Sequence, residues 1–135
     1  MTATIHYEGN LRCNAQHLQS GNSIETDAPT DNRGKGERFS PTDLVCTALG
    51  TCMLTTMAIK ATDMGIELKG ASVDVKKHMV ADPRRIGQID AVVTIPAILN
   101  LEEKDRTILE RVGDNCPVAK SLHPDVQTPI QFIYP

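Results

Sequence analysis

A long helix with a strong start signal is the feature that most constrains how this chain can fold. Ser40 is a typical N-cap residue, Pro41 follows at the first helical position, and Asp43 completes a capping box. We expect the helix to run to about Asp63 and to stop before Gly65. Mostly apolar residues recur at three- and four-residue steps and predict one broad buried face: Leu44, Val45, Ala48, Leu49, Cys52, Met53, Thr56 and Ile59.

Short alternating segments on both sides of this helix predict β-strands. Gly9-Asn10 and Gly21-Asn22 break residues 3–27 into two or three strands joined by hairpin turns. Residues 70–81 and 86–96 alternate around Asp82-Pro83 and predict a β-hairpin. Its inner faces are expected to include Val73, Val75, Val93 and Ile95.

The remaining segments predict a second helix, a short helical turn and a final strand. Asn100 with Glu103 suggests a helix N-terminus, and the helix should end near Gly113. "NCPVAKSLHP" predicts a short helical segment, and "TPIQFIY" a last strand. Residues 28–38, "APTDNRGKGER", lack an apolar period and should form a surface loop, of a kind that often lies beside a site.

The order of these segments indicates one α+β domain over residues 1–135. Its strands lie in hairpins, so we expect antiparallel sheets with a long central helix packed against them. The apolar face of that helix is wider than one small sheet covers. The sequence therefore also suggests a homodimer.

Charge and hydropathy exclude two classes of partner. The formal net charge is −3 and the pI is near 5.7, with the basic residues scattered, which argues against binding nucleic acid. No apolar run is expected to reach the roughly 20 residues that span a bilayer, and the segment "MTATIHYEG" lacks the features of a signal peptide. We therefore expect a cytoplasmic protein that binds no membrane, in a compartment where thiols stay reduced.

Two thiols on the long helix compete for a functional role. At about 100° per residue, Cys46 and Cys52 lie on different faces, and Cys52 is expected on the inward stripe with Leu49. Buried cysteine usually acts as a small apolar residue, so core packing is one interpretation and a reactive thiol the other. Cys52 lies about 18 Å along the axis from the N-cap, beyond the reach of the helix dipole. A reactive Cys52 therefore needs a cation from elsewhere in the fold.

Cys116 has a different local setting. It precedes Pro117 at the start of a short helical turn, where backbone N–H groups are unpaired. From local chemistry alone, Cys116 is expected to be the more acidic thiol.

Taken together, "SPTDLVCTALGTC" and "NCPVAKSL" resemble the OsmC/Ohr family of thiol-dependent hydroperoxide reductases. The resemblance implies an intertwined homodimer with active sites at the subunit interface. It implies that Cys52 is the peroxidatic thiol and Cys116 the resolving thiol, which together reduce small organic hydroperoxides. An external dithiol, typically a dihydrolipoyl group such as that of a lipoyl protein, then reduces the disulfide. No metal or organic cofactor is implied.

One position departs from the pattern of the resembled family. Those enzymes keep a glutamate that orients an activating arginine, and its place is taken here by Thr42. Arg12 and Arg38 are the candidate arginines, with Glu37 as a replacement anchor, while Asp43 is expected to serve the capping box. The alternative function is an OsmC-fold redox-sensing or apolar-ligand-binding protein with weak or no peroxidase turnover. A third alternative treats both cysteines as core packing.

Overall fold

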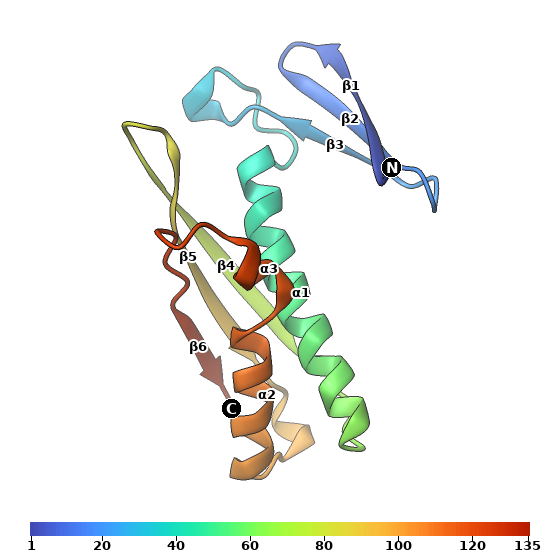
Figure 1. Ribbon diagram of the computed structural model, residues 1–135, viewed down its shortest axis with the longest axis vertical. Helices are drawn as coiled ribbons and strands as arrows, with labels where there is room; N and C mark the ends of the chain where they lie inside the picture. Colours follow the sequence, from blue (N-terminus) through green and yellow to red (C-terminus); the bar gives the residue numbers. More distant parts are fainter. The chain divides into compact units, whose positions relative to one another are not determined.

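The computed structural model describes all residues, 1–135, and its secondary structure follows the predicted order (Figure 1). The chain forms two compact units, Met1–Val45 and Cys46–Pro135. The first contains a three-stranded sheet and a loop. The second contains another three-stranded sheet and most of the helical residues.

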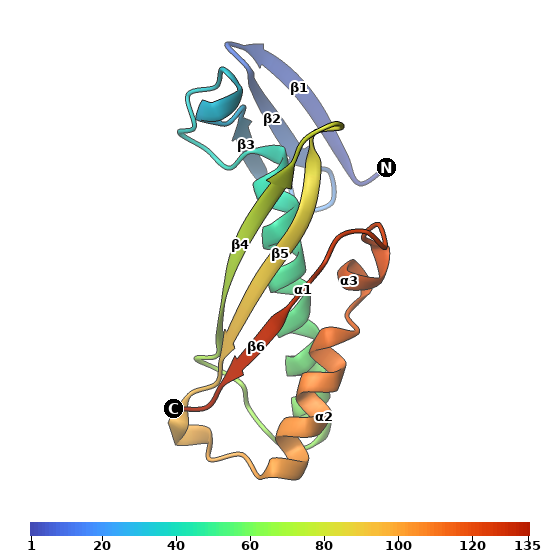
Figure 2. The same ribbon diagram turned by 90° about the vertical axis from the view of Figure 1, so that its left-hand side faces the viewer.

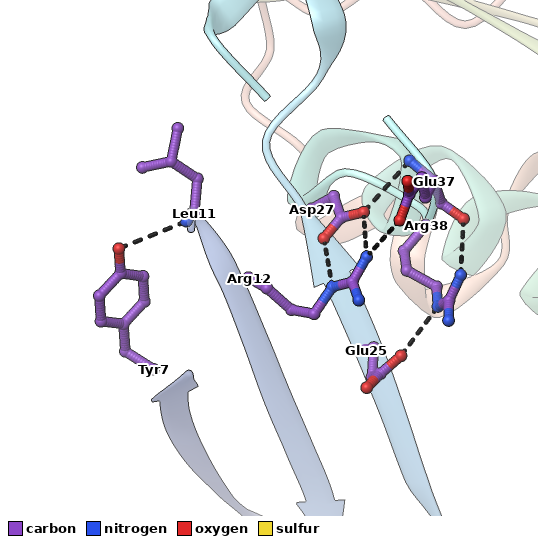
Figure 3. Close-up of polar contacts among 7 residues, drawn as sticks. All are labelled: Tyr7, Leu11, Arg12, Glu25, Asp27, Glu37 and Arg38. Atoms are coloured by element: carbon purple, nitrogen blue, oxygen red, sulfur yellow. Dashed lines mark hydrogen bonds and ion pairs between the residues drawn. The ribbon is translucent and has the colours of Figure 1, made fainter. Parts of the chain in front are cut away.

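The first unit is built on an antiparallel meander of β1 (Ala3–Gly9), β2 (Arg12–His17) and β3 (Ser23–Asp27). The predicted hairpins are therefore confirmed. At the β1–β2 turn, the Leu11 backbone N–H donates to the Tyr7 hydroxyl at 3.3 Å (Figure 3). The loop after β3 contains one 3₁₀ turn, η1 (Thr30–Asn32).

The register of this sheet separates an apolar face from a polar one. Ile5 pairs with Ala15, which pairs with Ile24, so these three residues lie in one row on the same face. Ile5 and Ile24 are 60% and 52% exposed. The opposite face carries Arg12 and Asp27, and Asp27 is the buried residue of the three strands. Ile5 and Ile24 therefore form an exposed apolar row on this face of the sheet.

Helix α1 (Pro41–Asp63) begins with the predicted capping box. The Ser40 backbone N–H donates to Asp43 Oδ2 at 2.9 Å, and the Asp43 N–H donates to Ser40 Oγ at 3.1 Å. These two reciprocal bonds satisfy backbone donors that the first turn leaves unpaired. The predicted start and end of the helix are both confirmed.

The buried face of α1 differs from the predicted one. Cys46 is buried, whereas Val45 and Ile59 are 36% and 63% exposed and Cys52 is half-buried. The expectation that Cys46 lies off the buried face was wrong, whereas Cys52 does pack against the core, although only half-buried. Apolar side chains occur around much of this helix, so their spacing alone did not fix which stripe packs inward. The buried residues are Cys46, Leu49, Gly50, Met53, Met57 and Ala61.

Helix α1 also corrects the hydropathy argument. Its mean hydropathy of 1.5 and its length meet the criteria for a membrane span, contrary to the sequence expectation. These criteria use length and composition only, and the core helices of globular proteins meet them too. Leu49, Met53 and Met57 are fully buried within the protein, which is the setting of a core helix.

The second unit is organised around β4 (Ser72–Val80), β5 (Arg85–Thr94) and β6 (Ile130–Ile133). β4 and β5 form the predicted antiparallel hairpin. β6 pairs with β5 in parallel, so this sheet is mixed rather than purely antiparallel. The sheet faces the viewer in Figure 2, with α1 and α2 behind it.

Close backbone approaches show how the helices pack on this sheet. A Cβ at Gly50 of α1 would lie 3.0 Å from Val73 Cγ1 of β4. A Cβ at Gly113 would lie 2.8 Å from Met57 Sδ, so the second helix packs against α1. The core between these layers contains Cys46, Leu49, Met53, Met57, Ala61, Leu68, Ile89, Ala91, Val93, Ile95, Leu101, Leu109 and Cys116.

The second helix, α2 (Glu103–Asp114), ends close to the predicted residue but starts differently. Asn100 does not cap it. Asn100 instead lies at the left-handed end of a 3₁₀ turn, η2 (Ala97–Leu99), and Glu102 occupies the N-cap position. Asparagine tolerates this backbone conformation, so the same residue type fits either role. A short helix, α3 (Pro117–Ser121), follows α2 as predicted.

Candidate active site

The second unit brings Cys52 and Cys116 together. Cys52 projects from the middle of α1 and is half-buried, while Cys116 is fully buried at the N-cap of α3. The two side chains are joined by a hydrogen bond, and none of the four cysteines forms a disulfide. The structure thus places an accessible thiol beside an enclosed one.

The pKa of Cys116 is raised above its ordinary value, chiefly because burial disfavours the thiolate. The N–H groups of Ala119 and Val118 act in the opposite direction but are outweighed. The hydrogen bond and the charge of Cys52 raise the Cys116 pKa further. The expectation that Cys116 is the more acidic thiol was wrong, because it considered the helical turn and not the burial of the sulfur.

Cys52 has a hydroxyl group, but no cation, among its hydrogen-bond partners. Thr56 Oγ1 donates to the Cys52 carbonyl at 2.7 Å and lies 4.0 Å from the Cys52 sulfur. Since the hydroxyl proton is already used, Thr56 can only accept from the thiol. Thr56 therefore offers the Cys52 sulfur an acceptor and not a donor.

An arginine cluster in the first unit contains three of the predicted residues, Arg12, Glu37 and Arg38 (Figure 3). Arg12 Nε and Nη2 donate to Asp27 Oδ1 and Oδ2 at 2.7 and 2.8 Å, and Nη2 also donates to Glu37 at 3.0 Å. This bidentate pairing holds the pKa of Asp27 below its usual value and raises that of Arg12. Asp27 is thus the main partner of Arg12, and Glu37 the second.

The sequence analysis missed Asp27. Its partner Arg12 lies on the neighbouring strand, directly opposite in the β2–β3 register. A hairpin alignment from the turn at Gly21-Asn22 could have revealed this pairing, because cross-strand neighbours of opposite charge interact.

Arg38 joins this cluster through the Glu37 backbone carbonyl, to which its Nη1 donates at 3.1 Å, whereas Thr42 bonds at the start of α1. Arg38 Nε donates to Glu25 at 2.8 Å, and its side chain is 47% exposed. Thr42 Oγ1 lies 3.1 Å from Ser40 Oγ, at the start of α1. Of the two candidate arginines, only Arg12 is held by a buried carboxylate.

The chain matches the family model of OsmC-like proteins over residues 34–131. It belongs to the OsmC-like family. A solved relative from Psychrobacter arcticus 273-4, assigned to the osmotic-stress-induced and detoxification response, is 47% identical with a TM-score of 0.92. That match covers 98% of this OsmC-like chain and 96% of the relative.

More distant solved structures share the OsmC fold. An organic hydroperoxide resistance protein OsmC from Legionella pneumophila is 16% identical with a TM-score of 0.75, covering 96% of this chain and 93% of that one. An OsmC-like protein from Mycoplasma pneumoniae is 16% identical with a TM-score of 0.79, covering 97% and 94%. No functionally curated protein matches this sequence. The predicted α+β fold is confirmed, and membership of the OsmC-like family indicates a peroxide-related redox function.

Proposed function

We propose that this OsmC-like protein reduces organic hydroperoxides, with Cys52 as the nucleophile and Cys116 as the resolving thiol. The observation that supports this most is the pairing of a half-buried thiol with a hydrogen-bonded, fully buried one. The raised pKa of Cys116 keeps that thiol protonated, so it can donate to the neighbouring sulfur. The OsmC/Ohr family acts on organic hydroperoxides, which supports the proposed substrate class.

The first step is attack of the Cys52 thiolate on the outer oxygen of the substrate O–O bond. The bond breaks, its electron pair leaves with the inner oxygen as an alkoxide, and a proton converts the alkoxide to an alcohol. Cys52 becomes a sulfenic acid, the first oxidation level of a thiol. The half-buried position of Cys52 allows a small organic molecule to reach the sulfur.

The second step joins the two sulfurs. The Cys116 sulfur attacks the sulfenic sulfur of Cys52, a disulfide forms, and the hydroxyl leaves as water with the Cys116 proton. An external dithiol then reduces this disulfide and is itself oxidised to a disulfide. A dihydrolipoyl group, free or carried by a lipoyl protein, is the proposed reductant, and a reducing cytoplasm is the proposed location.

Arg12 is the proposed cation for the Cys52 thiolate. Thr56 cannot serve this purpose, because its proton is bonded to a backbone carbonyl. Arg12 is half-buried and is fixed by two carboxylates, Asp27 and Glu37. An arginine held in this way retains donors for an anion while losing little conformational freedom on binding it.

A homodimer is the proposed assembly. The sheet of the first unit leaves Ile5, Tyr7 and Ile24 exposed at 60%, 65% and 52%. A second copy of the chain is the simplest cover for this apolar face, and it agrees with the general homodimeric state of the family. The active site is proposed to lie at the interface between the copies.

The proposed activity is tested with cumene hydroperoxide and dihydrolipoamide. We expect peroxide loss in many turnovers per protein molecule, and no loss above background in Cys52→Ser. Cys13→Ser removes a half-buried thiol of the first unit and is the matched control, expected to retain activity. Cys116→Ser should still oxidise once and accumulate a dimedone-reactive sulfenic acid. Equal rates for the native protein and Cys52→Ser would refute the proposal.

The alternative is a redox-sensing or apolar-ligand-binding protein of the same fold. It is favoured by the presence of Thr42 where the resembled enzymes keep a glutamate. It requires slow oxidation of Cys52 by cumene hydroperoxide and retention of an apolar molecule through gel filtration. Rapid multiple turnover with dihydrolipoamide would exclude this alternative.

A further inference from the structure

Two helices of the second unit pack together at a point where one of them has no side chain. Gly113 lies in the last turn of α2 and is buried. A Cβ at this position would lie 2.8 Å from Met57 Sδ and 3.1 Å from Met57 Cγ, both on α1. Carbon atoms in contact are normally about 3.5–4.0 Å apart. A side chain at position 113 would therefore displace Met57 or separate the two helices.

Met57 has little room to move away from such a side chain. It is fully buried, and Phe132 of β6 also lies beside Gly113, with Cζ 3.9 Å from the same Cβ position. Methionine is flexible and absorbs part of a displacement. A close-packed interior nevertheless responds to a change of one methyl group. A Cβ at position 113 should therefore shift the end of α2 as well as the Met57 side chain.

The last turn of α2 is tied directly to Cys116. The Cys116 backbone N–H donates to the Gly113 carbonyl at 3.3 Å, and the Asn115 N–H donates to the Val112 carbonyl at 3.3 Å. The Asn115 side-chain nitrogen also donates to the Arg111 carbonyl at 2.8 Å. Because of these bonds, a displacement of this turn should carry Cys116 with it.

The direction of the helices places this contact next to the two thiols. Figures 1 and 2 show α2 running antiparallel to α1, beside its C-terminal half. Going forward along the chain from Gly113 to Cys116 therefore follows the same direction as going back along α1 from Met57 to Cys52. Those five residues of α1 span about 7.5 Å. Cys52 and Cys116 meet at the end of both paths, where their side chains are hydrogen-bonded.

We infer that Gly113 is a positioning residue for disulfide formation: by letting α2 pack closely on α1, it keeps the Cys116 sulfur within reach of the Cys52 sulfenic acid. This inference rests on the proposed function. In the step concerned, the S–O bond of the sulfenic acid breaks and an S–S bond forms. The hydroxyl leaves as water with the Cys116 proton. Gly113 acts only through the position of Cys116.

The test follows the attack of each thiol separately and does not depend on peroxide turnover. The protein is mixed with dithionitrobenzoate in a Cys13→Ser background, which removes the other half-buried thiol. Cys52 attacks the reagent disulfide, and a first thionitrobenzoate leaves as a mixed disulfide forms. Cys116 then attacks the Cys52 sulfur and releases the second thionitrobenzoate. Stopped-flow absorbance records both phases, and Cys116→Ser should show the first phase alone.

Gly113→Ala should leave the first phase unchanged and slow the second. A misplacement of about 1 Å can slow a reaction between held groups about a hundredfold, and Met57 absorbs part of the shift, so we expect slowing on the order of tenfold. With cumene hydroperoxide, the same variant should accumulate a dimedone-reactive sulfenic acid that the native protein does not accumulate. A loss of stability alone would not divide the two phases in this way.

Matched variants separate positioning from general damage. Gly87→Ala introduces an equally close contact, 2.6 Å from Val80 Cγ1 within the β4–β5 hairpin, and should leave both phases unchanged. Gly113→Ala/Met57→Ala removes both Met57 atoms that the new Cβ meets and should restore the second phase. If Gly113→Ala does not fold, Gly113→Ala/Met57→Val takes its place. It keeps a γ-carbon and should be slower in the second phase than Gly113→Ala/Met57→Ala.

The outcomes distinguish this inference from the proposed function. A second phase in Gly113→Ala as fast as in the native protein would overturn the inference, even if the native protein turns over peroxide. Equal slowing in Gly87→Ala would also overturn it, because the effect would then reflect general loosening of the second unit. A native protein without peroxide turnover, but with a second phase that depends on Gly113, would overturn the proposed function and support the positioning role.

Discussion

The two sheets of this protein have the same number of strands and opposite environments. In the sheet of β4–β6, Ile89 and Val93 are fully buried beneath two helices. In the sheet of β1–β3, the buried residue is Asp27, while Ile5 and Ile24 are more than half exposed. One sheet is stabilised by apolar burial and the other by strand pairing and a buried ion pair.

This difference predicts which perturbation each sheet resists. Truncating an apolar side chain leaves a cavity in a packed core, but it leaves none on an exposed face. Removing a charge leaves a buried partner uncompensated but matters little where solvent screens the pair. Apolar substitutions in the core beside the second sheet, and charge substitutions in both sheets, can therefore break or sharpen the comparison.

The largest expected effect is that of Leu49→Ala on the core of the second unit. Leu49 is fully buried, and truncation should lower the free energy of unfolding by about 2–5 kcal/mol. Urea denaturation measures the change. Ile98→Ala, at a residue 90% exposed, is the control and should stay within about 0.5 kcal/mol. Similar values for both variants would contradict a tightly packed core.

The next effect is the acid sensitivity contributed by Asp27. The hydrogen bonds from Arg12 lower the pKa of Asp27 in the folded state. The stability that Asp27 contributes is therefore fully present above the ordinary aspartate pKa of about 3.9. It is lost as the pH falls through the folded-state pKa. Asp27→Asn should reduce the loss of stability below pH 4, measured as the urea midpoint against pH.

Asp90 provides the comparison within the second sheet. Its pKa is also lowered, by hydrogen bonds from Gln88 and then His78, so its contribution has the same sign. The Asp90 side chain is 36% exposed, so solvent screens the pair and Asp90→Asn should change the acid dependence less than Asp27→Asn. The reverse order would show that the first sheet does not depend on its buried ion pair.

A smaller effect is expected for Gly50→Ala, where α1 approaches β4. The new Cβ would meet Val73 Cγ1 at 3.0 Å and Val75 Cγ1 at 3.2 Å, and these β-branched side chains have little freedom to move. Overpacking costs about 1–3 kcal/mol, while alanine gains about 1 kcal/mol of helix propensity. We expect a net loss of about 1 kcal/mol in urea denaturation, and a net gain would show that the helix can move away from the sheet.

The smallest effect is expected for Glu25→Gln in the first sheet. Glu25 pairs with Arg38 at 2.8 Å, but both side chains are substantially exposed. Such pairs contribute about 0.2–1 kcal/mol, so the urea midpoint should barely change. A loss as large as that of Leu49→Ala would place this pair, too, among the interactions that hold the sheet together.

Local signals in the sequence were sufficient for most of the element boundaries. The capping box of Ser40 and Asp43 places α1 correctly, because both of its hydrogen bonds lie within four residues. The hairpin turns are equally local. Asn100 misled because asparagine serves both as a helix cap and as a left-handed residue, and only the preceding 3₁₀ turn distinguishes these roles.

The site required information that local patterns do not contain. The inward face of α1 depends on what packs against it, which is why Cys46 is buried and Val45 exposed. The acidity of Cys116 depends on burial and on Cys52, from another helix. Asp27 is fixed by hydrogen bonds from Arg12, which lies on the neighbouring strand. The resemblance to a family identified the two thiols, while their environments emerged only from the fold.

The parallel pairing of β6 with β5 has a consequence for how the protein folds. Each pair of neighbours in the first sheet closes through a short hairpin, but Ala91 of β5 meets Ile130 of β6 only after α2 and α3 have been placed between them. Contacts between distant residues require a large loss of chain entropy before any stabilisation is gained, and they slow folding. The sheet that covers the core should therefore be completed late. The exposed sheet should form early, and its apolar face is then accessible to other partly folded chains.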